Sequence, residues 1–345
     1  MKIQIQDRLR PFSHSPGHAV ILPKTNLTLK AYPSALLLYE NEKSYLEFVI
    51  KGLTGPLKGF TVQQDLEACK VYIYGEAKEG YFRLSIQARS NSAWLIFEKT
   101  PPKGIFVSDT LYQSGDQLEL KSHIVMKDLN QPQRLFLGSS KKKEAESIRK
   151  RKDLKEILPL WHRLGCLTPF QKPMPFQNHL QEVIKKNQPQ KVYDLLYEVY
   201  LGHLSSGLVP RAEDEEKQGL STFEGIDSGL LPVGADCIES LFFLETPGTF
   251  EILPCLLPSF VSGKFIGLET QNGCKIQFEW TKSKLRRLVI ESNVDQSLEL
   301  IFPSYVKSFR LRKALRGDKG RVIDVSDAEI RINRNKAIYL DLFKK

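Results

Sequence analysis

The sequence predicts a mainly β protein in which two β-sandwich-type domains flank a short helical segment. Three observations support this fold class: strand-length apolar runs fill the first part, helical spacing appears in the middle, and apolar alternation returns towards the end. A chain of 345 residues exceeds what one core usually serves. We therefore expect an N-terminal β-sandwich over 1–140, a helical segment with a long loop over 141–245, and a C-terminal β-domain over 246–345.

The N-terminal part consists of short runs rich in Val, Ile, Tyr and Phe that are separated by Gly and Pro. Examples are Leu36–Tyr39, Tyr45–Ile50, Val71–Tyr74 and Tyr81–Ile86. Turn residues recur about every ten positions, which is typical of a β-sandwich.

The first helical stretch is predicted over Lys141–Leu164, where Lys, Arg, Glu and Leu dominate. Its apolar side chains recur at helical spacing, namely Leu154, Ile157, Leu158, Trp161 and Leu164. Pro159 lacks an amide hydrogen and is expected to kink or divide this helix.

A second helical stretch is predicted around Leu180, Val183 and Ile184, with a stop near Asn187. The helix is expected to restart at Pro189, because proline is favoured in the first helical turn. The middle of the chain is therefore helical.

A long connection is predicted from Gly202 to Gly234, with an acidic patch at Glu213–Glu216. After it, Asp236 is an N-cap candidate with Glu239 three positions on, which predicts a short helix through Leu244.

The C-terminal part contains the clearest local signal, a β-hairpin. Phe265–Glu269 and Lys275–Trp280 alternate on either side of Asn272–Gly273, and Asn-Gly between alternating strands favours a two-residue turn. Further strands are predicted over Leu285–Ile290, Leu298–Phe302, Phe309–Leu311, Val322–Val325 and Ala337–Phe343.

Composition narrows the possible classes of protein. The start of the chain has no apolar run of signal-peptide length, and no stretch approaches the roughly 20 apolar residues of a membrane helix. We therefore expect a cytoplasmic protein without membrane segments. No phosphate loop, metalloprotease motif or dinucleotide fingerprint occurs, so no cofactor is expected.

The cysteines predict neither disulfides nor a metal site. An odd number without a C-x-x-C pair cannot form a complete disulfide set and does not resemble a zinc site. We expect buried, reduced thiols at Cys69, Cys166, Cys237, Cys255 and Cys274.

The net charge of +10 raises the question of an acidic partner. One basic cluster lies within Lys141–Lys155 and another within Lys307–Arg321. The first contains no aromatic residue and the second contains one, Phe309, so neither offers a series of aromatic faces for base stacking and nucleic acid is not expected. Either cluster is a solvated surface, or the first docks an acidic protein partner.

Part of the C-terminal sequence resembles the closing β-domain of family 95 glycoside hydrolases. The similarity covers roughly Asp236 to Ser292, about a sixth of the chain. It consists of a leucine-proline run, a Ser-Gly stretch, a Gly-Leu pair, a hairpin and a strand ending in Glu-Trp, at Phe250–Pro258, Ser262–Lys264, Gly267–Leu268, Asn272–Gly273 and Ile276–Trp280.

The resemblance implies an inverting α-L-fucosidase or related galactosidase, built from an N-terminal sandwich, a barrel of twelve helices and a C-terminal β-domain. In such enzymes an acid protonates the leaving oxygen while a base-held water attacks the opposite face. The family's base aspartate matches Asp227 in Phe223–Gly229, and Glu224 is a candidate carboxylate partner.

The chain departs from the family in two respects. Ser228 stands where the family has asparagine, and the middle segment has room for three or four helices, not twelve. We therefore expect a carbohydrate-related protein that has lost catalysis and acts in sugar binding or assembly. The alternatives are an active hydrolase with Asp227 as base, and an interaction scaffold with a basic helix.

Candidate substrate-binding residues are His14, Arg211 and Trp280. His14 belongs to a polar group with His18, but Pro16–Gly17 between them excludes the helical spacing of a metal pair. Trp280 offers an aromatic face for a sugar, although a tryptophan in a strand more often packs in the core.

Overall fold

A computed structural model describes residues 2–3, 9–41, 44–127, 133–138, 143–144, 154–169, 175–204, 229–327 and 329–344. The predicted mainly β class is confirmed, since 48% of the described residues are in strands and 18% in helices. The chain divides into two compact units. Unit 1 combines Met1–Leu129, Lys142–Lys172 and Glu198–Pro232, and unit 2 combines Asn130–Lys141, Pro173–Tyr197 and Val233–Lys345. Residues of the predicted helical segment thus belong to both units.

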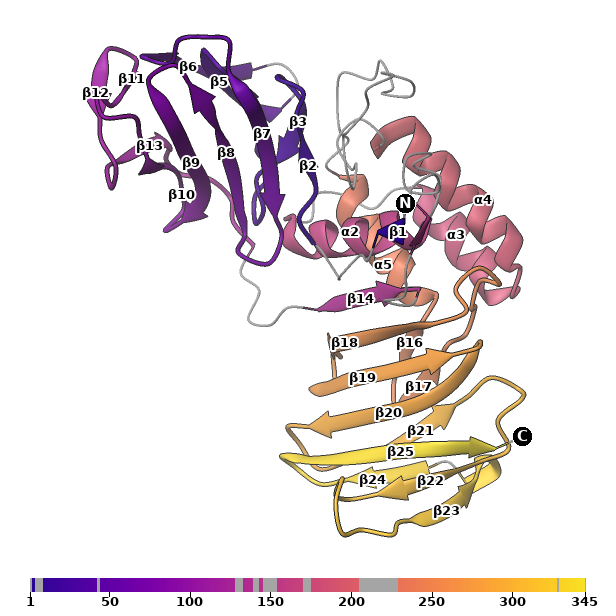
Figure 1. Cartoon of the computed structure of the whole chain (residues 1–345). Coiled ribbons are helices and arrows are strands. Elements are labelled where there is room, and N and C mark those ends of the chain that lie inside the picture. The colour runs from indigo at the N-terminus through magenta and orange to yellow at the C-terminus, as the bar shows by residue number, and fades with distance from the viewer. Residues whose placement is uncertain are drawn as a thin grey trace. The chain divides into compact units, whose positions relative to one another are not determined.

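Unit 1 contains two six-stranded sheets (Figure 1). In spatial order, the first consists of β13 (Gln117–Lys121), β10 (Ser92–Lys99), β9 (Gly80–Arg89), β8 (Lys70–Ala77), β7 (Lys58–Asp65) and β2 (Phe12–Ser13). The second consists of β12 (Thr110–Tyr112), β11 (Ile105–Val107), β6 (Ser44–Lys51), β5 (Ala35–Asn41), β4 (Thr28–Tyr32) and β3 (Ala19–Ile21).

These two sheets form a β-sandwich, because one apolar core contains side chains from both. Leu29 and Leu36 come from the second sheet and Val71 and Leu84 from the first, and all four are fully buried. Alternate residues of each strand point into this core, as a half-buried strand requires.

The helix α2 (Leu154–Leu167) confirms the predicted apolar spacing but not the predicted division. It continues through Pro159. A proline this close to the helix start removes one intrahelical bond at most, and the buried stripe, which includes Trp161, keeps the helix in place. The Trp161 Nε1 donates to the Leu230 carbonyl at 3.4 Å.

The prediction of helix from Lys141 onwards is wrong for two of the residues that the structure describes. β15 (Lys143–Glu144) is a short strand that pairs antiparallel with β1 (Lys2–Ile3). Charged residues stabilise a helix only weakly when the segment has no apolar stripe to bury. In this segment the apolar stripe begins at Leu154.

The other described helices are α3 (Pro175–Lys185), α4 (Pro189–Val199), a π-helix (Tyr200–Leu204) and α5 (Leu230–Ser240). The predicted break near Asn187 is confirmed, and that residue has a left-handed φ of 47°. Both predicted ends of this last helix, Asp236 and Leu244, are wrong, because the buried residues Leu230 and Leu231 already belong to α5 and Leu244 lies in the strand β16 (Phe243–Thr246). No helix in the described ranges is both long and apolar enough to cross a membrane.

Unit 2 is built on a seven-stranded sheet and a four-stranded sheet. The larger consists of β14 (Arg134–Leu137), β18 (Gly263–Glu269), β19 (Cys274–Thr281), β20 (Lys284–Ser292), β25 (Lys336–Lys344), β22 (Ser308–Arg312) and β23 (Arg321–Asp324). The smaller consists of β16 (Phe243–Thr246), β17 (Thr249–Ile252), β21 (Gln296–Ile301) and β24 (Glu329–Ile332). The predicted Asn272–Gly273 hairpin joins β18 to β19, and Gly273 has a φ of 80°.

A row of charges with alternating sign crosses five neighbouring strands of the larger sheet. The strand register places them directly opposite one another in the order Lys264, Glu279, Arg287, Asp341 and Arg310. Opposite charges on facing positions stabilise a pair of strands, and a slip of one residue would remove every such pair. The row therefore helps to specify the register of this sheet.

Candidate functional site

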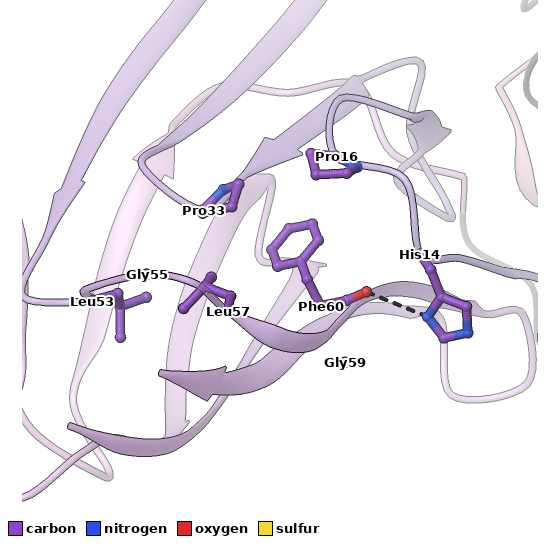
Figure 2. Close-up of a pocket in the computed structure, with 8 residues that line it drawn as sticks. All are labelled: His14, Pro16, Pro33, Leu53, Gly55, Leu57, Gly59 and Phe60. Carbon is purple, nitrogen blue, oxygen red and sulfur yellow. Dashed lines mark hydrogen bonds between the residues drawn. The ribbon is translucent and has the colours of Figure 1, made fainter. Parts of the chain in front are cut away.

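The N-terminal sandwich contains a hollow of about 460 Å³ (Figure 2). This volume lies in the range of small-molecule sites. Three segments line it: the connection from β2 to β3, the turn from β4 to β5, and the stretch from the end of β6 into β7. The lining residues are His14, Pro16, Pro33, Leu53, Gly55, Leu57, Gly59 and Phe60.

The walls of the hollow are mainly apolar. Phe60 belongs to the core of the sandwich and is 7% exposed, and Leu53 and Leu57 pack against that core. In Figure 2 the Phe60 ring lies between Leu57 and Pro16. The walls thus continue the core, which favours a pre-formed site.

Among the described residues that line the hollow, His14 is the only one with a titratable side chain. Its Nδ1 lies 2.9 Å from Thr61 Oγ1 and 3.3 Å from the Phe60 carbonyl. A carbonyl only accepts, and the Thr61 hydroxyl already donates to the Gly59 carbonyl at 2.9 Å. The hydrogen must therefore be on Nδ1, which makes Nε2 an acceptor in the neutral ring.

Gly17 fixes the connection that contains His14 and Pro16. Its amide donates to the Ala31 carbonyl at 2.8 Å, and its φ of 76° is left-handed. A Cβ at this position would overlap the Tyr32 ring. Glycine is therefore favoured here by its backbone conformation, and a Cβ would also require the Tyr32 side chain to shift.

The variant Gly17→Ala is expected to lower the free energy of unfolding of unit 1 by about 1–2 kcal/mol, because alanine is strained at this φ and its Cβ would displace the Tyr32 ring. Chemical denaturation measures the change. Gly248→Ala is the matched control, since Gly248 has a φ of 77° and nothing within 4 Å of its added Cβ. A loss no larger than that of the control would show that the Tyr32 contact is unimportant.

The opposite wall is held through Thr54 and Glu79. The Thr54 amide donates to Glu79 Oε2 at 2.9 Å, and the Thr54 hydroxyl donates to Oε1. These hydrogen bonds, first that from the hydroxyl, lower the pKa of Glu79. The anchoring is thus complete above the ordinary glutamate pKa and is lost as the pH falls through the lowered one.

The structure brings one of the predicted site residues, His14, into the hollow. Asp227, Glu224 and Arg211 lie outside the described residues. Trp280 is 1% exposed, and its Nε1 donates to the Phe260 carbonyl at 2.8 Å. Its ring also stacks on Phe242 at 5.3 Å. Trp280 therefore occupies the core position that the sequence offered as the alternative to sugar stacking.

Most of the lining residues were not predicted as site residues. Leu53 to Gly59 contains two glycines and a proline between two strands, a composition that indicates a turn. Nothing local distinguishes a turn over a hollow from an ordinary one. Only the dense polar residues around His14 pointed to this site in the sequence.

The cysteines are free thiols, as predicted, but the prediction that all five are buried is wrong, because Cys69 and Cys166 are only partly buried. Cys237, Cys255 and Cys274 are buried, and burial raises the pKa of Cys237 to about 12. A thiol with such a pKa stays protonated and unreactive at neutral pH. Among the described residues, no cluster of His, Cys, Asp and Glu side chains is suited to hold a metal ion.

No protein-family model matches the chain, and no curated protein matches it in sequence. The fold and the hollow alone define its class: a mainly β protein whose N-terminal sandwich contains a small and largely apolar hollow.

Proposed function

We propose that the protein binds a carbohydrate without catalysis, on a scaffold related to family 95 glycoside hydrolases. The hollow around His14 and Phe60 is the proposed sugar site. A pyranose ring has an apolar C–H face and polar edges. Apolar walls that include Pro16 and Phe60 suit the face, and an imidazole at the same hollow suits a hydroxyl at the edge.

The observation that carries this proposal is the fixed orientation of His14 beside an apolar wall. Two contacts to Nδ1, from the Phe60 carbonyl and the Thr61 hydroxyl, hold the ring in one tautomer before any ligand arrives. Binding then costs less side-chain entropy than it would with a mobile polar group.

The lining also favours binding over hydrolysis at this hollow. Inversion requires two carboxyl groups about 6.5–9.5 Å apart, and none of the described lining residues is an Asp or a Glu. The resemblance of Asp236 to Ser292 to the hydrolases supports the class of ligand. It does not supply an acid or base here.

The test is a titration of the full chain with fucosides, galactosides and glucans, followed by calorimetry and by saturation-transfer NMR. His14→Ala is expected to weaken binding about five- to tenfold, the value of one hydrogen bond. Gly55→Phe should abolish it, because a Cβ there meets only the Leu57 amide, at 3.8 Å, and the ring can fill the hollow.

His18→Ala is the control, a histidine of the same connection that does not line the hollow. Equal weakening by His18→Ala and His14→Ala would remove the hollow from the proposal. Absence of binding to every sugar would overturn the function itself.

Two further proposals rest wholly or largely on residues outside the described ranges. If aryl glycosides are hydrolysed by the wild type and not by Asp227→Asn, with Glu224→Gln also impaired, the protein is an enzyme. Salt-sensitive capture of an acidic protein through Lys141–Lys155 would instead make it a scaffold.

A further inference from the structure

The hairpin formed by β22 and β23 carries a dense positive charge. From Arg312 to Arg321 the chain contains one acidic residue, Asp318, against five basic ones: Arg312, Lys313, Arg316, Lys319 and Arg321. We call Arg312–Val322 the basic hairpin.

The single acid of the basic hairpin is used to shape its loop. Asp318 accepts hydrogen bonds from the amides of Lys313 at 2.6 Å and Gly320 at 2.7 Å. These backbone bonds, that of Lys313 first, lower the pKa of Asp318. The loop is therefore ordered from inside by the carboxylate, which leaves the basic side chains directed to its outside.

Arg312 closes the same loop. Its guanidinium donates to the Leu315 carbonyl at 2.9 Å and pairs with Asp341 at 2.5 Å. A Cβ added at Gly320 would collide with the side chain of Arg312. These two contacts of Arg312 tie the backbone of the loop to the sheet.

The rest of the basic hairpin faces solvent. Every residue from Lys313 to Val322 except Asp318 is exposed. Among the described residues, the four basic side chains beyond Arg312 have no acidic partner. Two large aliphatic side chains lie among them, Leu315 with 53% of its surface exposed and Val322 with 64%.

We propose that the basic hairpin docks on the surface of an anionic lipid membrane. Its ammonium and guanidinium groups would contact the headgroups, and Leu315 and Val322 would enter the interface beneath them. Anionic membrane surfaces bind cationic groups and aliphatic side chains together. Binding of a nucleic acid is typically stabilised by base stacking on aromatic side chains, and the basic hairpin contains no aromatic residue.

The test is co-sedimentation of the full chain with phosphatidylcholine vesicles that contain or lack phosphatidylserine. Binding is expected only with phosphatidylserine, and it should fall as salt is raised. Arg316→Gln with Lys319→Gln should weaken it roughly 30-fold, from about 1 kcal/mol for each cation. Leu315→Ser should weaken it about tenfold, because the buried aliphatic surface is lost.

The matched control is Lys282→Gln with Lys284→Gln, which removes the same charge from the exposed β19–β20 turn of unit 2. Its binding should equal that of the wild type. Equal weakening by both double variants would reduce the effect to net charge and overturn the proposal. So would failure of the wild type to sediment, or binding to duplex DNA that Leu315→Ser leaves unchanged. Sugar binding of the same variants is measured as well, so that a failure of membrane docking can be distinguished from a failure of the His14 site.

Discussion

Replacement of Trp280 by alanine is expected to lower the free energy of unfolding of unit 2 by about 3–5 kcal/mol. The indole is fully enclosed, stacks on Phe242, and donates its hydrogen to the Phe260 carbonyl. Truncation removes this packing, leaves a cavity, and deprives a buried carbonyl of its donor.

Hydrogen exchange followed by mass spectrometry locates this loss. Peptides from β18 and β19 should exchange faster, while those from β8 and β9 in unit 1 should not change. Trp280→Phe keeps an aromatic ring and loses the hydrogen bond, so its effect should be smaller. Trp94→Ala is the control in unit 1, where the indole is only partly buried. Faster exchange of β8 after Trp280→Ala would contradict the separate core of unit 2.

Replacement of Asp341 by alanine is expected to lower the free energy of unfolding of unit 2 by about 2–3 kcal/mol. Its carboxylate accepts from Arg310 at 2.7 and 3.1 Å and from Arg312 at 2.5 Å. The side chain is 16% exposed, and the Arg312 side chain 15%. Removing the acid leaves two partly buried guanidinium groups close together without their shared acceptor.

The same pair makes stability depend on pH. The hydrogen bond from Arg310, and after it the charge of Arg312, lower the pKa of Asp341. A lowered native pKa means that the unfolded chain binds the proton first as the solution is acidified. The stabilisation is therefore complete above the ordinary Asp pKa of about 3.9 and is lost as the pH falls through the lowered value.

Urea denaturation of the wild type and of Asp341→Asn at neutral and at acidic pH measures this dependence. The difference between the two proteins should shrink in acid, because the wild-type carboxylate then becomes neutral as well. Asp324→Asn, on the exposed edge strand β23, is the control and should differ little from the wild type at either pH. An Asp341 difference that is independent of pH would show that shape, not charge, is responsible.

Much of the fold could be predicted because its signals are local. Asn272–Gly273 between alternating strands predicted the hairpin, and the apolar stripe from Leu154 predicted α2. Alternation also placed Trp280 on the inward face of β19. Local signals fail where an element is very short, as in β15, or where burial extends a helix beyond its apparent cap, as at Asp236.

The candidate site was harder to predict because it is assembled from distant segments. His14, Pro33 and Phe60 approach one another only after the two sheets pack, and neither periodicity nor turn composition reports which turns meet. His14 was found because polar residues were dense around it. The catalytic candidates rested on resemblance instead, and Asp227 and Glu224 fall outside the described residues.

The division of the chain into units has a consequence for how the protein can be dissected. Three segments of unit 1 alternate along the sequence with three of unit 2, so the chain passes between the units five times. β14 of unit 2, for example, follows β13 and precedes β15, which both belong to unit 1. No single cut yields two intact halves, and a fragment that ends after the sandwich strands loses α2. A fragment that holds the whole of either unit would therefore have to rejoin three segments that are separate in the sequence.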